Sequence, residues 1–189
     1  WNKSADAYTP VRRKNYDGRT TIVNGEKQPD PNYAIDEGGA YVEKQNENAY
    51  KQRFAYFSSF YESIKGKPYP LDYEQQGIIN YFPDKNLLIL GLNSAWQLDH
   101  HYKNRASINM NALSNALTEI RRNPEYNDCL RIAVWHHPLN SAGNDRITDQ
   151  GFMEQLAKAS FRLFLHGHIH KAETSLYRYD MSQDGRKMD

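Results

Sequence analysis

The chain has 189 residues, 14 of them tyrosine, and its 24 Lys and Arg against 23 Asp and Glu give a net charge of +1. This length suits one domain with a buried core. The balanced charge gives no overall basic field for nucleic acid and no acidic tail. The single cysteine, Cys129, excludes an internal disulfide. No apolar run is long enough for a membrane helix. We therefore expect a cytoplasmic protein with no membrane partner.

Residues 1–45 are polar and rich in turn residues, such as Asp17-Gly18 and Asn24-Gly25. Thr20 to Val23 has the composition of a short strand. We expect the rest of this region to be a long surface loop, and loops of this length are often functional or mobile.

Residues 46–65 show the spacing of an amphipathic helix, which Gly66 and Pro68 end. Aromatic and aliphatic residues recur at intervals of three and four. We expect this stripe to pack in the core rather than to stack on bases. Its members are Tyr50, Phe54, Phe57, Tyr61 and Ile64.

Two apolar runs, 78–82 and 87–92, are separated by Pro83-Asp84-Lys85-Asn86, which predicts a β-hairpin. The second run is followed by Asn93-Ser94-Ala95-Trp96. Small polar residues at the end of a buried strand either line a site or only terminate the strand. Both interpretations stay open for Asn93 and Ser94.

The remaining elements alternate between helix and strand. A helix over 109–122 presents one apolar face, made of Met110, Leu113, Ala116, Leu117 and Ile120. Strands are expected over 130–135, 161–165 and 175–179, with a further helix over 150–160. Two strand–helix–strand steps with short connections indicate an α/β layered domain.

Two groups of histidines follow the strands at 130–135 and 161–165. His136-His137 comes after the first strand, and His166, His168 and His170 come after the second. Carboxyl ends of neighbouring parallel strands meet at one edge of a sheet, and neutral imidazole is a common metal ligand. The sequence therefore predicts a metal site, in which Gly167 lets the backbone turn.

A pair of ions would need more than imidazoles. Two cations held close together need bridging oxygen ligands, normally carboxylates, because they repel each other. Asp145 and Glu173 are nearby carboxylates, but neither belongs to a recognisable motif. The sequence lacks the motifs of zincins, zinc deaminases, α/β-hydrolases, Walker-A proteins and dinucleotide-binding domains.

The segment Val134-Trp135-His136-His137-Pro138-Leu139, followed by Leu165-His166-Gly167-His168-Ile169-His170, resembles the last two motifs of the calcineurin-like metallophosphoesterases. Those motifs are a His-x-Pro turn and a Gly-His-x-His turn. Leu88 to Trp96 also resembles the middle strand of bacterial members. The resemblance covers residues 46–178, with a polar tail over 179–189. It implies a two-sheet β-sandwich flanked by helices, with a dinuclear metal centre at the strand ends.

The resemblance also implies roles for individual histidines. His136 would bind one metal ion, and His168 and His170 would each contact one of the two ions, which would be Mn, Fe or Zn. His137 matches no ligand position; it orients a neighbour, contacts substrate as a candidate catalytic residue, or faces solvent. His166 precedes the glycine of the motif, and we expect it to be a packed histidine at the strand end.

The earlier motifs of the family do not occur in the sequence. They are Asp-x-His, Gly-Asp-x-x-Asp and Gly-Asn-His-Asp, which would supply the bridging carboxylate. Trp1-Asn2 is similar to the residues that follow the last of these turns. The chain therefore resembles the C-terminal half of such a domain. We expect it to have an unpaired sheet edge and an exposed apolar face, and to be inactive without the N-terminal half.

The predicted function is metal-dependent hydrolysis of a phosphate mono- or diester. One alternative is a metal- or partner-binding module without catalysis, and another is a closed four-ligand structural zinc site. Residues 1–45 and the segment with His100 and His101 are where we expect substrate selectivity. Nucleic acid has only the three arginines Arg105, Arg121 and Arg122 in its favour.

Overall fold

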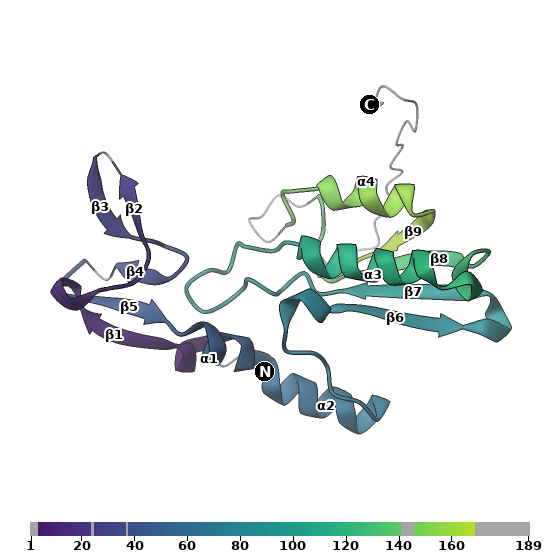
Figure 1. Ribbon diagram of the computed structural model, residues 1–189, viewed down its shortest axis with the longest axis horizontal. Helices are drawn as coiled ribbons and strands as arrows, with labels where there is room; N and C mark the ends of the chain where they lie inside the picture. The colour runs from purple at the N-terminus through teal and green to yellow at the C-terminus, as the bar shows by residue number, and fades with distance from the viewer. Residues whose placement is uncertain (1–3, 24, 37, 141–145, 169–189) are drawn as a thin grey trace. The chain divides into compact units, whose positions relative to one another are not determined.

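The computed structural model describes residues 4–23, 25–36, 38–140 and 146–168 (Figure 1). The chain is a mixed α/β protein that divides into two compact units, Trp1–Leu71 and Asp72–Asp189. The described residues form a three-stranded, a two-stranded and a four-stranded sheet. The predicted mixture of helices and strands is confirmed. Across the described ranges, every helix is too short or too polar to cross a membrane.

The first unit begins with short strands. The three-stranded antiparallel sheet has the order β1 (Tyr8–Arg12), β5 (Tyr41–Gln45) and β4 (Ala34–Asp36). A hairpin pairs β2 (Thr20–Val23) with β3 (Glu26–Pro29), which confirms the predicted strand at 20–23. The prediction of a loop over 1–45 is otherwise wrong. These strands are short and carry many charged side chains, so their hydrophobic alternation is weak.

The predicted helix over 46–65 is confirmed as three consecutive segments: α1 (Glu47–Lys51), a 3₁₀ turn (Gln52–Phe54) and α2 (Ala55–Lys65). The Asn46 side chain caps the start by accepting a hydrogen bond from the Ala49 amide, 3.0 Å away. Gly66 ends α2 in the left-handed conformation, with a φ of 71°. These helices belong to the first unit rather than to the second.

The aromatic stripe of these helices is only partly buried. Tyr50 is buried, and Phe57 and Tyr61 pack around Tyr69 with ring centroids 5.0 and 5.5 Å from it. Ile64 is 64% exposed, so its predicted core position is wrong. It lies in the last turn of α2, two residues before the cap at Gly66.

The second unit carries the four-stranded sheet, in the order β6 (Gly77–Phe82), β7 (Leu87–Leu92), β8 (Leu130–Val134) and β9 (Phe161–Leu165). β6 and β7 pair antiparallel, which confirms the predicted hairpin, and the other two pairs are parallel. The crossovers contain α3 (Met110–Arg122) and α4 (Gly151–Lys158). The strand predicted over 175–179 lies outside the described residues.

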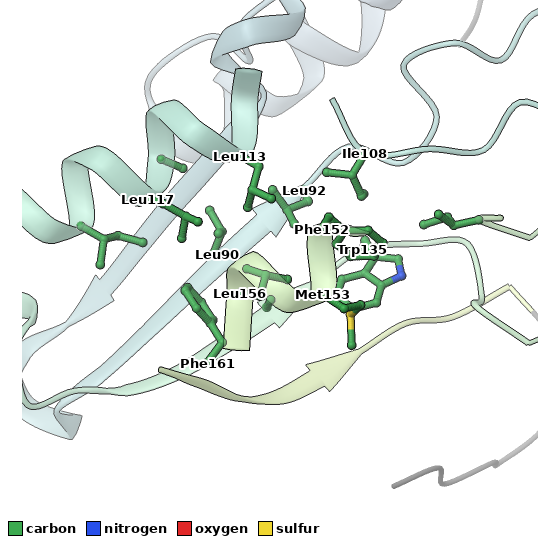
Figure 2. Close-up of a cluster of buried hydrophobic side chains, with 14 of the residues drawn as sticks. Leu90, Leu92, Ile108, Leu113, Leu117, Trp135, Phe152, Met153, Leu156 and Phe161 are labelled. Atoms are coloured by element: carbon green, nitrogen blue, oxygen red, sulfur yellow. The ribbon is translucent and has the colours of Figure 1, made fainter. Parts of the chain in front are cut away.

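Helices α3 and α4 cover one face of this sheet (Figure 1) and enclose its core. Figure 2 shows side chains from both helices gathered over the strands, among them Leu113, Leu117 and Leu156. Leu88, Leu90 and Leu92 point from β7 into this core. Met110, which the helical pattern grouped with the buried face of α3, is 39% exposed because it lies at the first residue of the helix.

The opposite face of the same sheet is also apolar. The paired registers bring isoleucine, leucine, valine and phenylalanine side chains together on it, and each of these is half-buried or exposed. A sheet whose two faces are both apolar is typical of one covered on both sides. The apolar side chains of this second face are those of Ile78, Phe82, Leu87, Ile89, Leu130, Ile132, Val134, Leu163 and Leu165, and Asn80 and Gly91 lie on the same face.

Candidate metal centre

The carboxyl ends of β7, β8 and β9 meet at one edge of the sheet. Ser94 follows β7, His136 and His137 follow β8, and His168 follows β9. Two backbone hydrogen bonds continue the pairing of β8 and β9 past their ends: the Trp135 amide donates to the Leu165 carbonyl, and the Gly167 amide to the His136 carbonyl, each 3.0 Å. Segments 32 residues apart in the sequence are thereby held side by side.

The site contains two imidazole nitrogens at the spacing of metal ligands. Nε2 of His136 and Nδ1 of His168 are 3.0 Å apart, and the two rings are perpendicular. Two nitrogens that bind one ion at about 2.0–2.1 Å lie about 2.9–3.4 Å from each other in octahedral or tetrahedral geometry. The two rings are within hydrogen-bond distance of each other, and the same spacing fits a shared ion. His170, the third predicted ligand, lies outside the described residues.

The backbone turns at His168 rather than at Gly167. His168 has a φ of 75°, whereas the described glycines with positive φ are Gly25, Gly38 and Gly66. The predicted role of Gly167 as the turning residue is therefore wrong. A Cβ at Gly167 would lie 3.7 Å from Nδ1 of His136, which is ordinary contact.

His137 is the buried histidine of the group. It is 6% exposed, and its Nδ1 lies 2.8 Å from the hydroxyl oxygen of Ser94, which is 2% exposed. The same hydroxyl oxygen accepts hydrogen bonds from the backbone amides of His136 and His137, each 3.2 Å. One ring nitrogen from each of His136, His137 and His168 lies within 4.8 Å of the others, so the geometry admits His137 to the cluster.

The other predicted histidines lie in different settings. His166 is exposed and stacks on Trp135, with ring centroids 6.3 Å apart and an interplanar angle of 25°. His100 and His101 lie against each other in the loop between β7 and α3, with ring centroids 3.9 Å apart and planes tilted by 42°. Asp99 shapes that loop, because its carboxylate accepts hydrogen bonds from the His101 and Tyr102 amides.

Carboxylates are the missing component of the cluster. Within the described ranges, the ligand group around His136 contains histidines alone. Asp145 and Glu173, the two acidic candidates from the sequence, lie outside the described residues. The described part of the site therefore offers nitrogen ligands for one ion.

Sequence reasoning left two features of the site undetermined. The sequence placed Ser94 at a strand end, but its contact with His136 and His137 depends on β7 lying next to β8 with its end in register. The burial of His137 was not predicted either. Its one signal in the sequence is the Pro138-Leu139 that follows, of which Leu139 is buried.

Comparison with protein-family models, with curated proteins and with solved structures finds no match to this chain.

Proposed function

We propose that the second unit carries part of a dinuclear metal site that hydrolyses a phosphate mono- or diester. The observation that carries this proposal is the 3.0 Å separation of His136 Nε2 and His168 Nδ1. The order of the motifs supports it, because His136-His137-Pro138 follows β8 and Gly167-His168-Ile169-His170 follows β9.

In this proposal His136 and His168 hold one ion, and His170 serves the second. Imidazole nitrogens suit Fe or Zn, and Mn would depend more on the oxygen ligands of the same centre. When bound, such a pair of ions lowers the pKa of a water molecule and holds the phosphate oxygens for in-line displacement. The contribution of the protein is to fix the two imidazoles, which it does through the backbone hydrogen bonds between the ends of β8 and β9.

Oxygen ligands must come from elsewhere in this proposal. Two close cations repel each other unless oxygen ligands bridge them, and the cluster in the described residues has none. We infer that an N-terminal half of the domain supplies them. The apolar second face of the sheet supports this inference, because a second sheet packed there would form a β-sandwich with helices outside.

The test is hydrolysis of an aryl phosphate diester and monoester by the full-length protein loaded with Mn²⁺. We expect turnover in the parent protein, a loss of at least roughly a hundredfold in His168→Ala, and no turnover by residues 1–189 alone. His166→Ala is the control, because it removes an exposed imidazole from the same strand end. Activity that survives His168→Ala, or an inactive metal-loaded parent, would rule the proposal out.

A second candidate is a metal- or partner-binding module without catalysis. The histidine-only composition of the described cluster favours it, since three imidazoles hold one ion without a bridged pair. This candidate predicts one bound ion per full-length chain and no hydrolysis of either substrate. Metal counting beside the activity assay separates the two candidates.

A further inference from the structure

The outer edge of β6 is open in the described part of the chain. There β6 pairs with β7 alone, and no backbone hydrogen bond joins its other side to a described segment. In an antiparallel pair, alternate residues direct their N–H and C=O groups away from the partner strand. Every residue of β6 also keeps solvent access, including Ile79 on the side of α3, whereas Leu88 and Leu90 of β7 are buried. The edge therefore has room for a further strand.

β6 lacks the features that protect edge strands from pairing. Protected edges are short, or they carry charged residues or proline. The other outer strands follow this rule: β1 and β3 contain proline and charged residues, β9 contains Arg162, and β2 and β4 have only four and three residues. β6 has six residues, Gly77-Ile78-Ile79-Asn80-Tyr81-Phe82, without a charge or a proline. This composition is typical of a strand that is paired on both sides.

Asn80 is a polar residue among apolar neighbours on the second face of the sheet. Ile78 and Phe82 precede and follow it on that face, and Ile89 of β7 lies opposite it. Asn80 is half-buried, and its side-chain amide has no hydrogen bond to any residue that the structure describes. An amide carries both donors and an acceptor, so two asparagine side chains complement each other. A second Asn80 is therefore a fitting partner for the first.

Sheet geometry selects one register for two copies of β6. Strands related by a two-fold axis at their shared edge run antiparallel, and residues directly opposite each other lie on the same face. A ladder centred on Asn80 pairs the two amides and sets Ile78 opposite Phe82 of the second copy. Ladders centred on Ile79 or Tyr81 would place Asn80 opposite Ile78 or Phe82, where its amide would stay unpaired. The amide therefore favours the ladder centred on Asn80.

We propose that two copies of this chain pair through β6, antiparallel about a two-fold axis at Asn80, and join their four-stranded sheets into one continuous sheet. The ladder is short, so the dimer is reversible and depends on concentration. Asparagine has a comparable role in coiled coils, where one polar pair fixes the register. The proposal does not rest on the proposed hydrolysis, because none of its residues belongs to the histidine cluster.

Sedimentation velocity with charged substitutions at Asn80 tests the register. Leu130→Lys with Leu163→Lys is the background, because these changes on β8 and β9 suppress association through the rest of the second face. We expect a reversible dimer in this background. Asn80→Asp or Asn80→Lys should weaken it at least about tenfold, because like charges then meet at the axis. An equal mixture of the two variants should recover the dimer, which also requires that both variants fold.

The control is Arg162→Glu, an exposed charge change on the edge strand β9, which should leave the dimer unchanged. A chain that stays monomeric up to high concentration would overturn the proposal, since the edge would then have no second copy as its partner. A mixture of Asn80→Asp and Asn80→Lys that stays monomeric would overturn it as well, because opposite charges facing each other at the axis should attract.

Amide hydrogen exchange locates the interface without any substitution at Asn80. In the dimer the outward N–H groups of β6 donate across the axis. We expect them to exchange at least about threefold more slowly at high than at low concentration of the background chain. The outward amides of β9 serve as the control and should not respond to concentration, since β9 is the other edge of the sheet. A dimer that protects β9 and leaves β6 unchanged would overturn the proposal.

Discussion

His168 adopts a backbone conformation that is costly for any residue with a Cβ. Its φ of 75° lies in the left-handed region, where an L-residue loses roughly 1–2 kcal/mol. Such conformations persist where the surroundings fix them, and they concentrate at ligand sites. Here the fixing contact is the hydrogen bond from the Gly167 amide to the His136 carbonyl. The strain orients a proposed ligand, so stability and function oppose each other at this position.

Replacing this histidine by glycine should reveal the stored strain. We expect His168→Gly to raise the free energy of unfolding of the metal-free chain by up to about 1 kcal/mol, because relief of strain exceeds the added entropy of the unfolded chain. Urea denaturation measures the change. The converse control is Gly66→Ala, at a φ of 71°, which should destabilise. A less stable His168→Gly chain would contradict the strain argument.

Tyr69 gives the first unit a predictable response to alkali. Burial raises the pKa of its hydroxyl above the ordinary value of 10.0, and the neighbouring Tyr61 adds to the rise. A folded pKa above the unfolded one contributes stability that is complete below pH 10 and is lost as pH rises toward the folded pKa. We therefore expect Tyr69→Phe to unfold like the parent near neutral pH but to lose less stability above pH 10.

Urea denaturation of both chains across that alkaline range measures this difference. Tyr56→Phe, at an exposed position of α2, is the control for removing a hydroxyl. Equal alkaline slopes for the parent and Tyr69→Phe would contradict the prediction.

Helix α3 has a side-chain cap at its N-terminus and one buried face. The Asn109 side chain accepts a hydrogen bond from the Ala112 amide at 3.0 Å. Arg121 and Arg122 lie in the last turn, where cations suit the helix dipole. The buried face packs on the sheet so closely that a Cβ at Gly77 of β6 would lie 2.8 Å from the Ala112 carbonyl oxygen. Substitutions on this face should therefore be costly.

A matched pair of alanine substitutions tests the packing of α3. Leu113 is fully buried and Met110 is 39% exposed on the same helix. We expect Leu113→Ala to lower the free energy of unfolding by about 3 kcal/mol, because it leaves a cavity in the core, and Met110→Ala by less than about 1 kcal/mol. Chemical denaturation measures both. Equal effects would mean that α3 is not seated on the sheet as described.

Local patterns predicted the elements of the second unit and missed most of those in the first. The helix over 109–122 and the strands at 87–92 and 161–165 have strong periodicity, so short windows suffice. β1 and β5 instead depend on each other: Tyr8 pairs with Gln45, and only Val42 of β5 is buried. Pairing at such a separation leaves little trace in a local window.

The second unit has one core, between the sheet and helices α3 and α4, and a second apolar face on the other side of the sheet. Leu130, Leu163 and Leu165 are each about half exposed on that second face. Contiguous apolar patches of this kind mark interaction surfaces or sites of aggregation. The expectation of an exposed apolar face is thus confirmed for the described residues. In the proposed two-sheet sandwich, a second sheet covers this face.

Charged substitutions on this face should change association without unfolding the chain. We expect residues 1–189 to self-associate with rising concentration, and Leu130→Lys with Leu163→Lys to reduce that association while leaving the free energy of unfolding within about 1 kcal/mol. Sedimentation velocity and urea denaturation measure the two quantities. Leu90→Lys, in the buried core, is the control that should unfold. If the double variant unfolds as well, the face is buried in the native chain.

The sequence predicts where the site lies better than how it works. His136 and His168 follow strands that any periodicity analysis finds, and parallel pairing brings the ends of those strands together. The contacts of Ser94 are different, because its hydroxyl meets the amides of His136 and His137 and the ring of His137 only when β7 and β8 end side by side. Those contacts follow from the register of two strands and are not visible in either one alone.

The hydrogen-bonded ladder beyond β8 and β9 makes the two imidazoles resemble the arms of a chelating agent. The two arms are joined by the Trp135–Leu165 and Gly167–His136 backbone hydrogen bonds instead of by covalent bonds. β9 is an edge strand of the four-stranded sheet as described, and edge elements open more often than the whole domain unfolds. Detachment of β9 would separate His168 from His136, so an ion shared by the two would lose one of its ligands. The affinity of the proposed site for an ion would therefore depend on the stability of the pairing between β8 and β9.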